Sequence, residues 1–404
     1  MSAGAKYLVV GPSWIGDTVM AQSLYKLLVS RDLSAEIHVA APAWSVPVLD
    51  RMPEVTRAWE LPVVHGELGI GKRWRLARKL RQEGFQRAIV LPRSLKASLV
   101  PFFASVPART GYRGEWRFGL INDIRPFDAE RLDQTIKRFV ALGLGLEETA
   151  LPSIPRPRLN IDRNNLRAAT ERLGLDSESD AVALIPGAEY GPAKRWPLKY
   201  YADLASRLVR VGLKVWILGS KKEYELGNAV SSPANHPNVI NLCGETSLAD
   251  VIDLLGAARV AVTNDSGLMH VAAAVGTHVM GIYGSSSPHF TPPLTDSKDV
   301  FYLDLECSPC FQRECPLGHF RCMTDLGVES SAAPWLRRSV VPRLSGSQGS
   351  QNRSDGHTER RIRWLISGSR GLVQRSFSLM VDYSIVCPTG GSSSPFGGKE
   401  PRYS

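Results

Sequence analysis

The sequence lacks any long hydrophobic run. None of its apolar stretches approaches the ~18 uninterrupted residues that a membrane-spanning helix needs. The first residues, MSAGAKYLVV, have no basic region followed by a long apolar segment and a cleavage site, so we predict no signal peptide. A share of 43% hydrophobic and 22% charged residues is ordinary for a globular protein. We therefore expect a cytoplasmic protein, and its 404 residues are enough for two domains.

Several catalytic signatures are also missing. No G-x-x-x-x-G-K-[ST] loop occurs, which argues against a P-loop ATPase. The first expected strand–helix turn lacks G-x-G-x-x-G, which argues against a standard nicotinamide dehydrogenase. The H-E-x-x-H and G-x-S-x-G motifs are absent as well, so neither a zinc protease of that type nor an α/β-hydrolase is indicated.

Acidic residues are scarce at one end of the chain. The formal net charge is +10, but residues 331–404 alone carry ten Arg and one Lys against two Asp and two Glu. A basic excess confined to a tail does not indicate a nucleic-acid groove in the body, so we expect no nucleic-acid partner. The same region is rich in Gly and Ser. We therefore predict that residues 329–404 form an atypical, low-complexity basic tail that is mostly disordered.

Cysteine is rare, and four of the six cysteines occur in one stretch, CSPCFQRECPLGHFRC. These are Cys307, Cys310, Cys315 and Cys322, with His319 among them. Cys-x-x-Cys followed by further Cys and a His is compatible with zinc, but the spacing matches no standard finger or ribbon. Reduced thiols in a loop are the simpler interpretation, and the expected compartment disfavours a disulfide. We assign no metal, and the state of the cluster stays open.

Strand-like and helix-like segments alternate along the chain. Apolar strands are predicted at 7–11, 36–42, 87–92 and 108–112, and again at 181–187, 214–220, 260–266 and 279–285. Helices are predicted between them, at 17–31, 46–55, 71–83 and 94–105 and then at 199–212, 247–258 and 267–276. This alternation predicts βαβ units, and the nearly continuous apolar strands fit parallel sheets covered on both faces.

The Pro-rich segment LPSIPRPRLNID (151–162) separates the two series and has no amphipathic period. It is typical of an interdomain linker. We therefore predict an α/β protein with two Rossmann-like domains facing across a deep cleft. The expected boundaries are 1–160 for the N-terminal domain and 161–328 for the C-terminal domain. Clefts between domains are favoured ligand sites.

A carboxylate follows the first strand, in YLVVGPSWIGDTVM (7–20). This turn from a buried strand into a helix lies at the carboxyl edge of the sheet, where open α/β folds bind ligands. Asp17 is therefore a candidate catalytic residue. It is equally a candidate cap of the helix, and the local pattern does not decide between the two interpretations.

A second strand–helix junction is PGAEYGPAKRWP (186–197). Gly187 and Gly191 allow tight turns, and Lys194 and Arg195 come just before a helix. A helix N-terminus beside a lysine is a suitable phosphate site. Solvated surface charge flanked by turn glycines is the alternative.

Two further junctions complete the set. In TNDSGLMHVAAAVG (263–276), Asp265 or Ser266 is placed to cap a helix whose first amides, from Gly267 on, suit a pyrophosphate. His270 lies one turn later and is either a packing residue or a ligand contact. In ILGSKKEYELG (217–227), Glu223 follows a strand, where an acid often binds ribose hydroxyls, although Glu is also common near helix starts.

Six long stretches resemble the lipopolysaccharide heptosyltransferases of glycosyltransferase family 9, and among them the group that adds the second heptose. They are GPSWIGDTVMAQSL, APAWSVPVLDRMPEV, VLPRSLKASLVPFF, TGYRGEWRFGLIND, PGAEYGPAKRWP and TNDSGLMHVAAAVG. The resemblance runs from about residue 6 to about residue 328. It implies the GT-B fold and transfer of L-glycero-D-manno-heptose from ADP-heptose to the first inner-core heptose, with inversion. The implied acceptor is lipid A–Kdo–heptose, and because it is lipid-anchored we expect peripheral contact with the inner face of the cytoplasmic membrane.

The resemblance also implies that the domain at 1–160 binds the acceptor and that the domain at 161–328 binds ADP-heptose. It implies roles for individual residues, and no metal or other cofactor. The general base is expected to be Asp17. The nucleotide-sugar-binding residues are expected to be Lys194 at the phosphates, Asp265, Ser266 and Gly267 at the pyrophosphate, His270 nearby and Glu223 at the ribose. Arg113 and Lys96 are expected to bind the acidic acceptor. The basic helix at 71–83 and the residues near Arg109 and Arg117 are further candidates, or only a solvated basic face.

The chain departs from the family pattern in two places. Arg93 stands where the family has Asn, on the acceptor side. Family members usually end soon after the position of Leu326 with a helix that packs back on the body, and this chain loses that pattern. Two alternatives therefore stay open: a family member acting on a different core position, and a copy that binds nucleotide sugar but is inactivated by its altered C-terminus.

Overall fold

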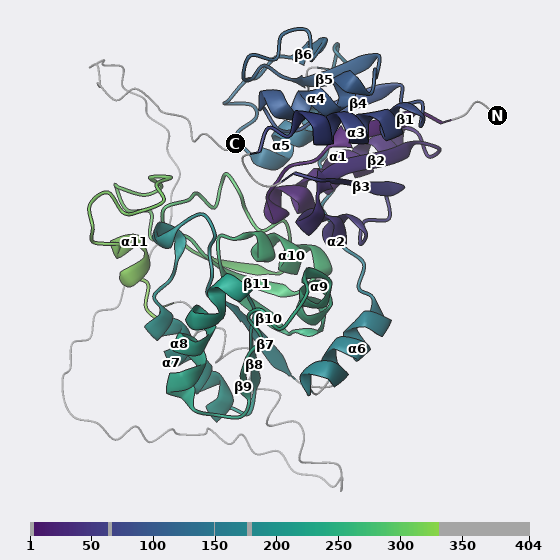
Figure 1. Ribbon diagram of the computed structural model, residues 1–404. Coiled ribbons are helices and arrows are strands. Elements are labelled where there is room, and N and C mark those ends of the chain that lie inside the picture. Colours follow the sequence, from purple (N-terminus) through teal and green to yellow (C-terminus); the bar gives the residue numbers. More distant parts are fainter. Residues whose placement is uncertain (1–3, 64–66, 149, 176–179, 331–404) are drawn as a thin grey trace, which may run out of the picture. The chain divides into compact units, whose positions relative to one another are not determined.

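The computed structural model describes residues 4–63, 67–148, 150–175 and 180–330 (Figure 1). Its N-terminal sheet has the order β3-β2-β1-β4-β5-β6 and consists of β1 (Lys6–Val10), β2 (Glu36–Pro42), β3 (Arg57–Leu61), β4 (Arg87–Val90), β5 (Ala108–Tyr112) and β6 (Asp123–Arg125). Its helices are α1 (Ile15–Arg31), α2 (Val46–Leu49), α3 (Ile70–Arg81), α4 (Leu95–Phe103) and α5 (Thr135–Ala141), with a 3₁₀ turn η1 at Ala43–Ser45.

The C-terminal sheet has the order β12-β11-β10-β7-β8-β9 and consists of β7 (Ala181–Ile185), β8 (Lys214–Ile217), β9 (Val239–Asn241), β10 (Val260–Asn264), β11 (His278–Ile282) and β12 (Lys298–Phe301). Its helices are α6 (Arg163–Leu173), α7 (Leu198–Arg210), α8 (Tyr224–Ala234), α9 (Leu248–Ala257), α10 (Gly267–Val275) and α11 (Arg321–Thr324), with 3₁₀ turns η2 at Pro192–Lys194 and η3 at Lys221–Glu223.

The strand order repeats in the two sheets, and every strand pair is parallel. In each sheet the chain starts in a central strand, moves out to one edge, and returns to the centre before filling the other side. The direction reverses between β1 and β4 in the first sheet and between β7 and β10 in the second. Ligands of doubly wound sheets bind at the carboxyl ends of such strand pairs.

Alternate residues of one strand enter different cores. Leu8 of β1 packs in a cluster with Leu80 of α3 and Val100 of α4, whereas Val9 packs in a cluster with Leu24 of α1. Because successive side chains of a strand point to opposite faces, helices cover both faces of this sheet. This explains why the central strands read as continuous apolar runs, and it confirms the predicted α/β class.

The predicted central strands and their helices are present, with shifts of a few residues at their ends. The strands that the sequence did not reveal are the sheet edges β3, β6, β9 and β12, and the helices α5, α6, α8 and α11 were not predicted either. These strands are short, and their half-exposed charged and polar residues hide the pattern. The helix predicted at 46–55 is wrong in length, because α2 ends at Leu49, shortly before Pro53.

The predicted linker has no regular secondary structure, but it is firmly attached. Gln22 of α1 donates to the carbonyl of Arg158 at 2.7 Å and accepts from the Arg158 amide at 2.8 Å. The amide of Leu159 donates to the carbonyl of Ala274 in α10 at 3.0 Å. Within the described residues both sheets belong to one compact unit, so the boundary at residue 160 stays a prediction.

A buried carboxylate joins segments that are far apart in sequence. Asp253 in α9 is fully buried and accepts from Arg51 at 2.7 Å, from the amide of Asp162 at 2.9 Å and from Asn165 at 2.8 Å. A buried charge is tolerated only when it is paired and hydrogen-bonded. The contacts of Asp253 therefore hold the chain in place on both sides of the linker.

The last described residues pack against the body. Leu326 and Val328 are buried, and the carbonyl of Leu326 accepts a 2.6 Å hydrogen bond from the indole of the fully buried Trp196. The structure does not describe residues 331–404. The predicted tail and the predicted loss of a closing helix concern these residues.

Candidate active site

Asp17 lies in the first turn of α1 and is not its cap. The helix begins at Ile15, two residues earlier than predicted, so that Trp14 occupies the N-cap position, and no side chain makes a capping hydrogen bond there. The capping interpretation of Asp17 is therefore wrong. The carboxylate still benefits from the partial positive charge at the helix N-terminus.

The surroundings of Asp17 favour its protonated form. Burial raises the pKa of Asp17 to about 7; the ammonium of Lys194 opposes this shift and the carboxylate of Asp265 adds to it. Asp17 is nevertheless partly exposed, and it has no hydrogen-bond or ion-pair partner within the described part of the chain. A carboxylate with these properties is available to accept a proton near neutral pH.

Lys194 and Asp265 form a buried ion pair at the ends of two neighbouring strands. Lys194 follows β7, Asp265 follows β10, and their Nζ and Oδ2 atoms lie 2.5 Å apart. The two residues are 8% and 6% exposed. Burial alone would raise the pKa of Asp265, but the charge and hydrogen bond of Lys194 hold it below the ordinary value. The structure thus brings together two residues that the sequence predicted at separate junctions.

The capping predicted for α10 is also wrong in detail. Ser266 occupies the N-cap position, but its side chain makes no capping hydrogen bond, and the carboxylate of Asp265 is paired with Lys194 instead. The amide of Met269 donates to the carbonyl of Ser266 at 3.2 Å, whereas the amides of Gly267 and Leu268 have no partners within the helix, as at any helix start. They are therefore available to an anion, as the sequence predicted for Gly267 and its neighbours.

The N-termini of α1 and α10 meet at two glycines. A Cβ atom on Gly16 would lie 2.8 Å from Cδ2 of His270, and one on Gly267 would lie 3.0 Å from Cβ of Ile15. Since only glycine permits this approach, two helix ends of like dipole converge beside Asp17. Such a concentration of positive potential suits a pyrophosphate.

His270 is buried, and its Nδ1 atom has no hydrogen-bond partner among the described residues. Burial lowers the pKa of His270 to about 4, with Asp265 opposing and Lys194 adding to the shift. The ring is therefore neutral at pH 7. Packing against Gly16 and binding a ligand through Nδ1 are both compatible with this geometry.

Glu223 lies over the ends of β7 and β8. A Cβ on Gly187 would lie 1.7 Å from its Oε1 atom and one on Gly219 would lie 3.1 Å from its Oε2 atom, so the two glycines make room for it. Oε2 accepts from the amide and the hydroxyl of Ser220 at 2.7 and 2.9 Å, in the capping box of η3. Its capping role is thus observed, while Oε1 stays available for the predicted ribose contact.

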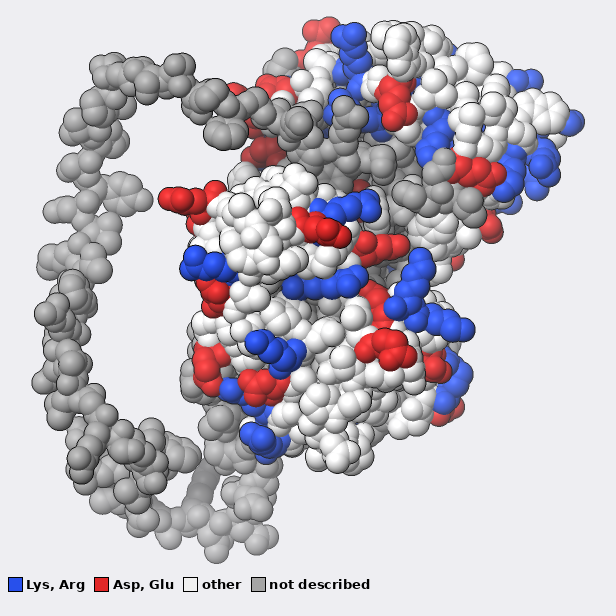
Figure 2. Space-filling model, turned by 60° about the vertical axis from the view of Figure 1, so that its left-hand side comes forward, with Lys and Arg blue, Asp and Glu red and all other residues white. Residues whose placement is uncertain are grey.

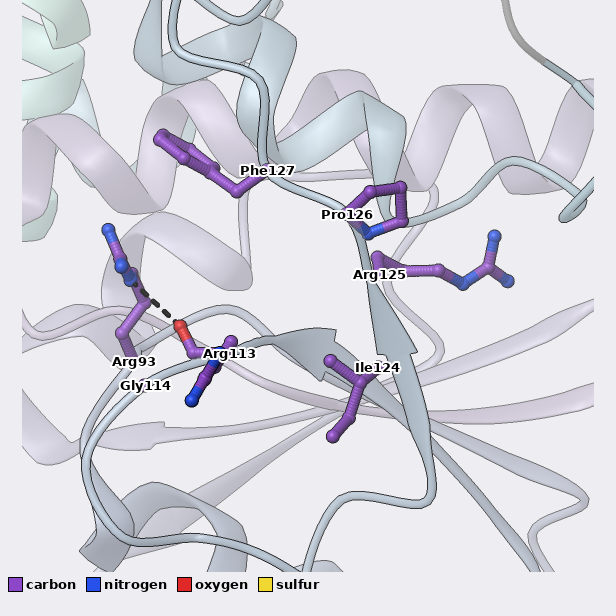
Figure 3. A pocket seen from close by; sticks show the side chains of 7 residues that line it. All are labelled: Arg93, Arg113, Gly114, Ile124, Arg125, Pro126 and Phe127. Carbon is purple, nitrogen blue, oxygen red and sulfur yellow. Dashed lines mark hydrogen bonds between the residues drawn. The ribbon is translucent and has the colours of Figure 1, made fainter.

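The two residues predicted to bind the acceptor differ in their surroundings. Arg113 is exposed and lines an open pocket of about 670 Å³ beyond the ends of β4, β5 and β6 (Figure 3). Lys96 is partly exposed in the first turn of α4 and does not line this pocket. Of the other candidates, Arg117 is buried and Arg109 donates to several backbone carbonyls, so neither is a solvated surface charge. On the face shown in Figure 2, basic and acidic side chains are interspersed.

Sequence reasoning missed the residues that hold the loop at 186–197 in place. Asn264, at the end of β10, is fully buried and donates to the carbonyl of Pro186 at 2.8 Å, while it accepts from the amide of Trp196 at 2.9 Å. Tyr190 donates to the carbonyl of Phe311 at 2.7 Å, and Lys194 lies over its ring at 5.0 Å. No local pattern identifies these partners, because they come from distant segments.

The cysteine cluster contains free thiols. Cys307 is exposed, and Cys310, Cys315 and Cys322 are partly buried. Burial and the neighbouring cysteines raise the pKa of Cys322 to about 11. Among the described residues, no group of three or more His, Cys, Asp or Glu side chains has the geometry of a metal site.

The fold and the site define a class of protein. Two doubly wound sheets with a carboxylate, a lysine and a helix N-terminus at their strand ends form the GT-B arrangement of glycosyltransferases. The structure superposes on that of ADP-heptose lps heptosyltransferase II from E. coli with a TM-score of 0.75 and 40% identity, covering 84% of this chain and 99% of that one.

Sequence comparison identifies the family. Residues 73–321 match the family model of glycosyltransferase family 9 (heptosyltransferase). The chain is 45% identical over 307 residues to lipopolysaccharide heptosyltransferase 2 of Escherichia coli (strain K12), covering 74% of this chain and 88% of that protein. It is 39% identical over 308 residues to lipooligosaccharide heptosyltransferase 2 of Haemophilus influenzae, covering 73% and 88%. The chain belongs to glycosyltransferase family 9, and it is a glycosyltransferase.

Proposed function

We propose that the protein transfers L-glycero-D-manno-heptose from ADP-heptose to the first heptose of the lipopolysaccharide inner core, with inversion at the anomeric carbon. Relatives named heptosyltransferase 2 support this assignment. The observation that carries the chemistry is Asp17, a carboxylate without a partner in the described chain and with a pKa of about 7, beside Lys194 and Asp265.

In the proposed reaction, Asp17 acts as general base. It takes the proton from the acceptor hydroxyl while that oxygen forms a bond to the anomeric carbon of heptose. The bond from this carbon to the phosphate oxygen breaks on the opposite face, and ADP leaves with the electron pair. A base with a pKa near the working pH is effective for this step. Holding both substrates in line supplies much of the rate enhancement.

The departing ADP gains negative charge, and we assign its stabilisation to Lys194 and the first amides of α10. Lys194 is preorganised by its 2.5 Å contact with Asp265, so the ammonium has little freedom to lose when the diphosphate binds. Ser266 and Gly267 lie at the same helix start. Glu223 would accept hydrogen bonds from the ribose through Oε1, and His270 would donate from or accept at Nδ1.

We also propose that the protein acts at the inner face of the cytoplasmic membrane through peripheral contact. No helix in the described ranges is both long and apolar enough to cross a bilayer. On α3, Ile70 and Trp74 are 52% and 46% exposed beside Arg75, Arg78 and Lys79. Exposed apolar and aromatic residues beside basic ones suit an anionic lipid surface.

Sedimentation with lipid vesicles tests the membrane contact. The wild-type protein should bind vesicles that contain phosphatidylglycerol more strongly than vesicles of phosphatidylcholine alone, and Trp74→Ser should reduce the bound fraction. Equal binding of both proteins to both vesicle types would remove α3 from the proposal.

Transfer from ADP-heptose to a mono-heptosylated core acceptor tests the activity. Asp17→Ala should lose roughly 10²-fold or more in kcat. It should keep its affinity for ADP, measured by calorimetry. Asp50→Ala is a matched control, because Asp50 is exposed at the end of α2. Equal transfer by wild type and Asp17→Ala would exclude Asp17 as the base. Binding of ADP without transfer by the wild type would favour the inactivated copy.

A further inference from the structure

The loop after β11 contacts the buried ion pair of the site. The hydroxyl of Thr291 makes a long, 3.4 Å hydrogen bond to Oδ1 of Asp265, whose Oδ2 atom contacts Lys194. The carbonyl of Thr291 accepts a 2.7 Å hydrogen bond from Tyr283, the fully buried residue that follows β11. The position of Asp265 therefore depends in part on this loop.

Residues 287–291, which we call the bridge loop, form a compact turn. The amides of Phe290 and Thr291 donate to the carbonyl of Ser287 at 3.2 and 3.3 Å, and the amide of His289 donates to its hydroxyl at 3.2 Å. Serine side chains commonly close turns in this way. The side chains of His289 and Phe290 therefore project from a well-defined backbone.

These two side chains reach α5, a helix of the other sheet. Nε2 of His289 lies 2.9 Å from Oδ2 of Asp133, two residues before α5 begins. The guanidinium carbon of Arg138, on α5, lies 4.7 Å from the centre of the Phe290 ring, which is within the range of a cation–π contact. The bridge loop thus joins the two sheets through one charged contact and one aromatic contact.

Arg138 is held firmly on its own side of this junction. Its Nε donates to the carbonyl of Leu132 at 2.9 Å, and its carbonyl accepts from the hydroxyl of Tyr112 at 2.6 Å. The same guanidinium lies 4.9 Å from the ring of Phe127, after β6, so it contacts one aromatic ring from each half of the protein. Phe290 therefore meets a partner whose position is already fixed.

Helix α5 also packs against α1, the helix that carries Asp17. Phe139 of α5 and Leu24 of α1 lie in the same buried cluster. The bridge loop therefore connects the ion pair at the second sheet with the helix that positions Asp17 at the first. An inverting transfer depends on this alignment, because the base and the leaving group act on opposite sides of the anomeric carbon.

Two contacts described above also join the sheets. They are the approach of α1 to α10 at Gly16 and the hydrogen bond from Arg51 to Asp253. Two bodies that touch at two points can still rotate about the line through these points. A third contact, made by other elements, opposes this rotation.

We propose that the bridge loop is a positioning element that aligns Asp17 with the buried ion pair. His289 and Phe290 act through α5 on one side and through Thr291 on the other, and we assign them no contact with the reacting atoms. The inference rests on the proposed function, since it concerns the alignment that heptose transfer needs.

Steady-state transfer and calorimetry of ADP binding test the aromatic contact. Phe290→Ala should lower kcat roughly tenfold, because small displacements of reacting groups are costly. Its affinity for ADP should stay unchanged, since the groups assigned to ADP all follow strands of the second sheet. Phe290→Tyr keeps the ring and should retain the wild-type kcat, and circular dichroism checks folding. Unchanged kcat in Phe290→Ala, or an equal loss of kcat and ADP affinity, would overturn the proposal.

A double-mutant cycle tests the charged contact. His289→Gln and Asp133→Asn should each lower kcat by about two- to fivefold, the range expected when a partly exposed ion pair is lost. The double variant should be no slower than the slower single variant, because both changes remove the same contact. His236→Gln, at an exposed histidine after α8, is the matched control and should transfer as the wild type does. Losses that multiply in the double variant would refute this contact.

Hydrogen exchange separates this inference from the activity. The amides of Phe290 and Thr291 are hydrogen-bonded within the turn, and in Asp133→Asn, across the junction, they should exchange several-fold faster than in the wild type. If the wild type transfers no heptose but Asp133→Asn still shows the faster exchange, the proposed function is overturned and the bridge stands. Equal exchange in both proteins would overturn the bridge.

Discussion

Nζ of Lys194 lies 2.5 Å from Oδ2 of Asp265, and both residues are almost completely buried. The pair also acts on Asp17, because Lys194 lowers and Asp265 raises the pKa of that carboxyl. The three residues therefore form one electrostatic unit, with the first residue on α1 and the other two at adjacent strand ends of the second sheet.

The pH dependence of transfer should follow Asp17. Since burial raises the pKa of Asp17 to about 7, the carboxyl is protonated below that pH and cannot accept a proton. The value of kcat/KM should fall roughly tenfold per pH unit below about 7 and level off above it. Initial rates between about pH 5 and pH 9 measure this. A profile that stays flat between about pH 5 and pH 7 would contradict the assignment of Asp17 as base.

Charge changes at the buried pair should move this profile in opposite directions. In Asp265→Asn the negative charge that raises the pKa of Asp17 is lost, so the acidic limb should shift to lower pH. In Lys194→Gln the limb should shift to higher pH, and ADP affinity should fall as well. Arg167→Gln, an exposed change on α6, should leave the limb in place. Identical apparent pKa values in all variants would show that the groups do not interact.

The stability of the protein should depend on the pair being complete. Lys194→Met leaves the carboxylate of Asp265 buried and unpaired, which should cost about 3–5 kcal/mol in the free energy of unfolding at pH 8. The double variant Lys194→Met/Asp265→Leu removes both charges and should recover most of that loss. Urea unfolding at pH 8 measures both values. A double variant as unstable as the single one would mean that packing, not charge, is responsible.

The sequence predicted the strands correctly where both faces of a strand are buried. Central strands such as β1 and β10 are covered on both faces and consist of apolar runs, so they were predicted within a few residues. Edge strands such as β3 and β12 are half exposed, and their charged residues remove the pattern. Their pairing depends on tertiary contacts, which no local window contains.

The site was predictable only as separate parts. Each of Asp17, Lys194 and Asp265 follows an apolar strand, and this position marked it as a candidate. The ion pair between two of them was not predictable, because 71 residues separate Lys194 from Asp265. The pocket lined by Arg113 was not predicted either, because its wall comes from the ends of three strands that are separate in the sequence. The capping error arose from a helix start placed two residues too late.

The close approach of α1 and α10 gives a last prediction. Gly16→Ala would place a methyl group 2.8 Å from Cδ2 of the buried His270, so α10 or the ring must move. Overpacking of this kind should cost about 1–3 kcal/mol of stability. Because α10 starts beside Asp265, the shift should also disturb the geometry between Asp17 and Lys194. A displacement approaching ~1 Å can cost roughly 10²-fold in rate, so kcat should fall further than the loss of stability alone explains.

A second glycine provides the control for Gly16→Ala. A Cβ on Gly71, in the first turn of α3, would meet no atom within 4 Å, so Gly71→Ala should keep full activity and gain about 0.4–1 kcal/mol of stability. Thermal unfolding and kcat, measured for both variants, separate crowding from the general effect of replacing glycine. If Gly16→Ala behaved like Gly71→Ala in both measurements, the contact between the two helix ends would not be needed for the alignment of the site.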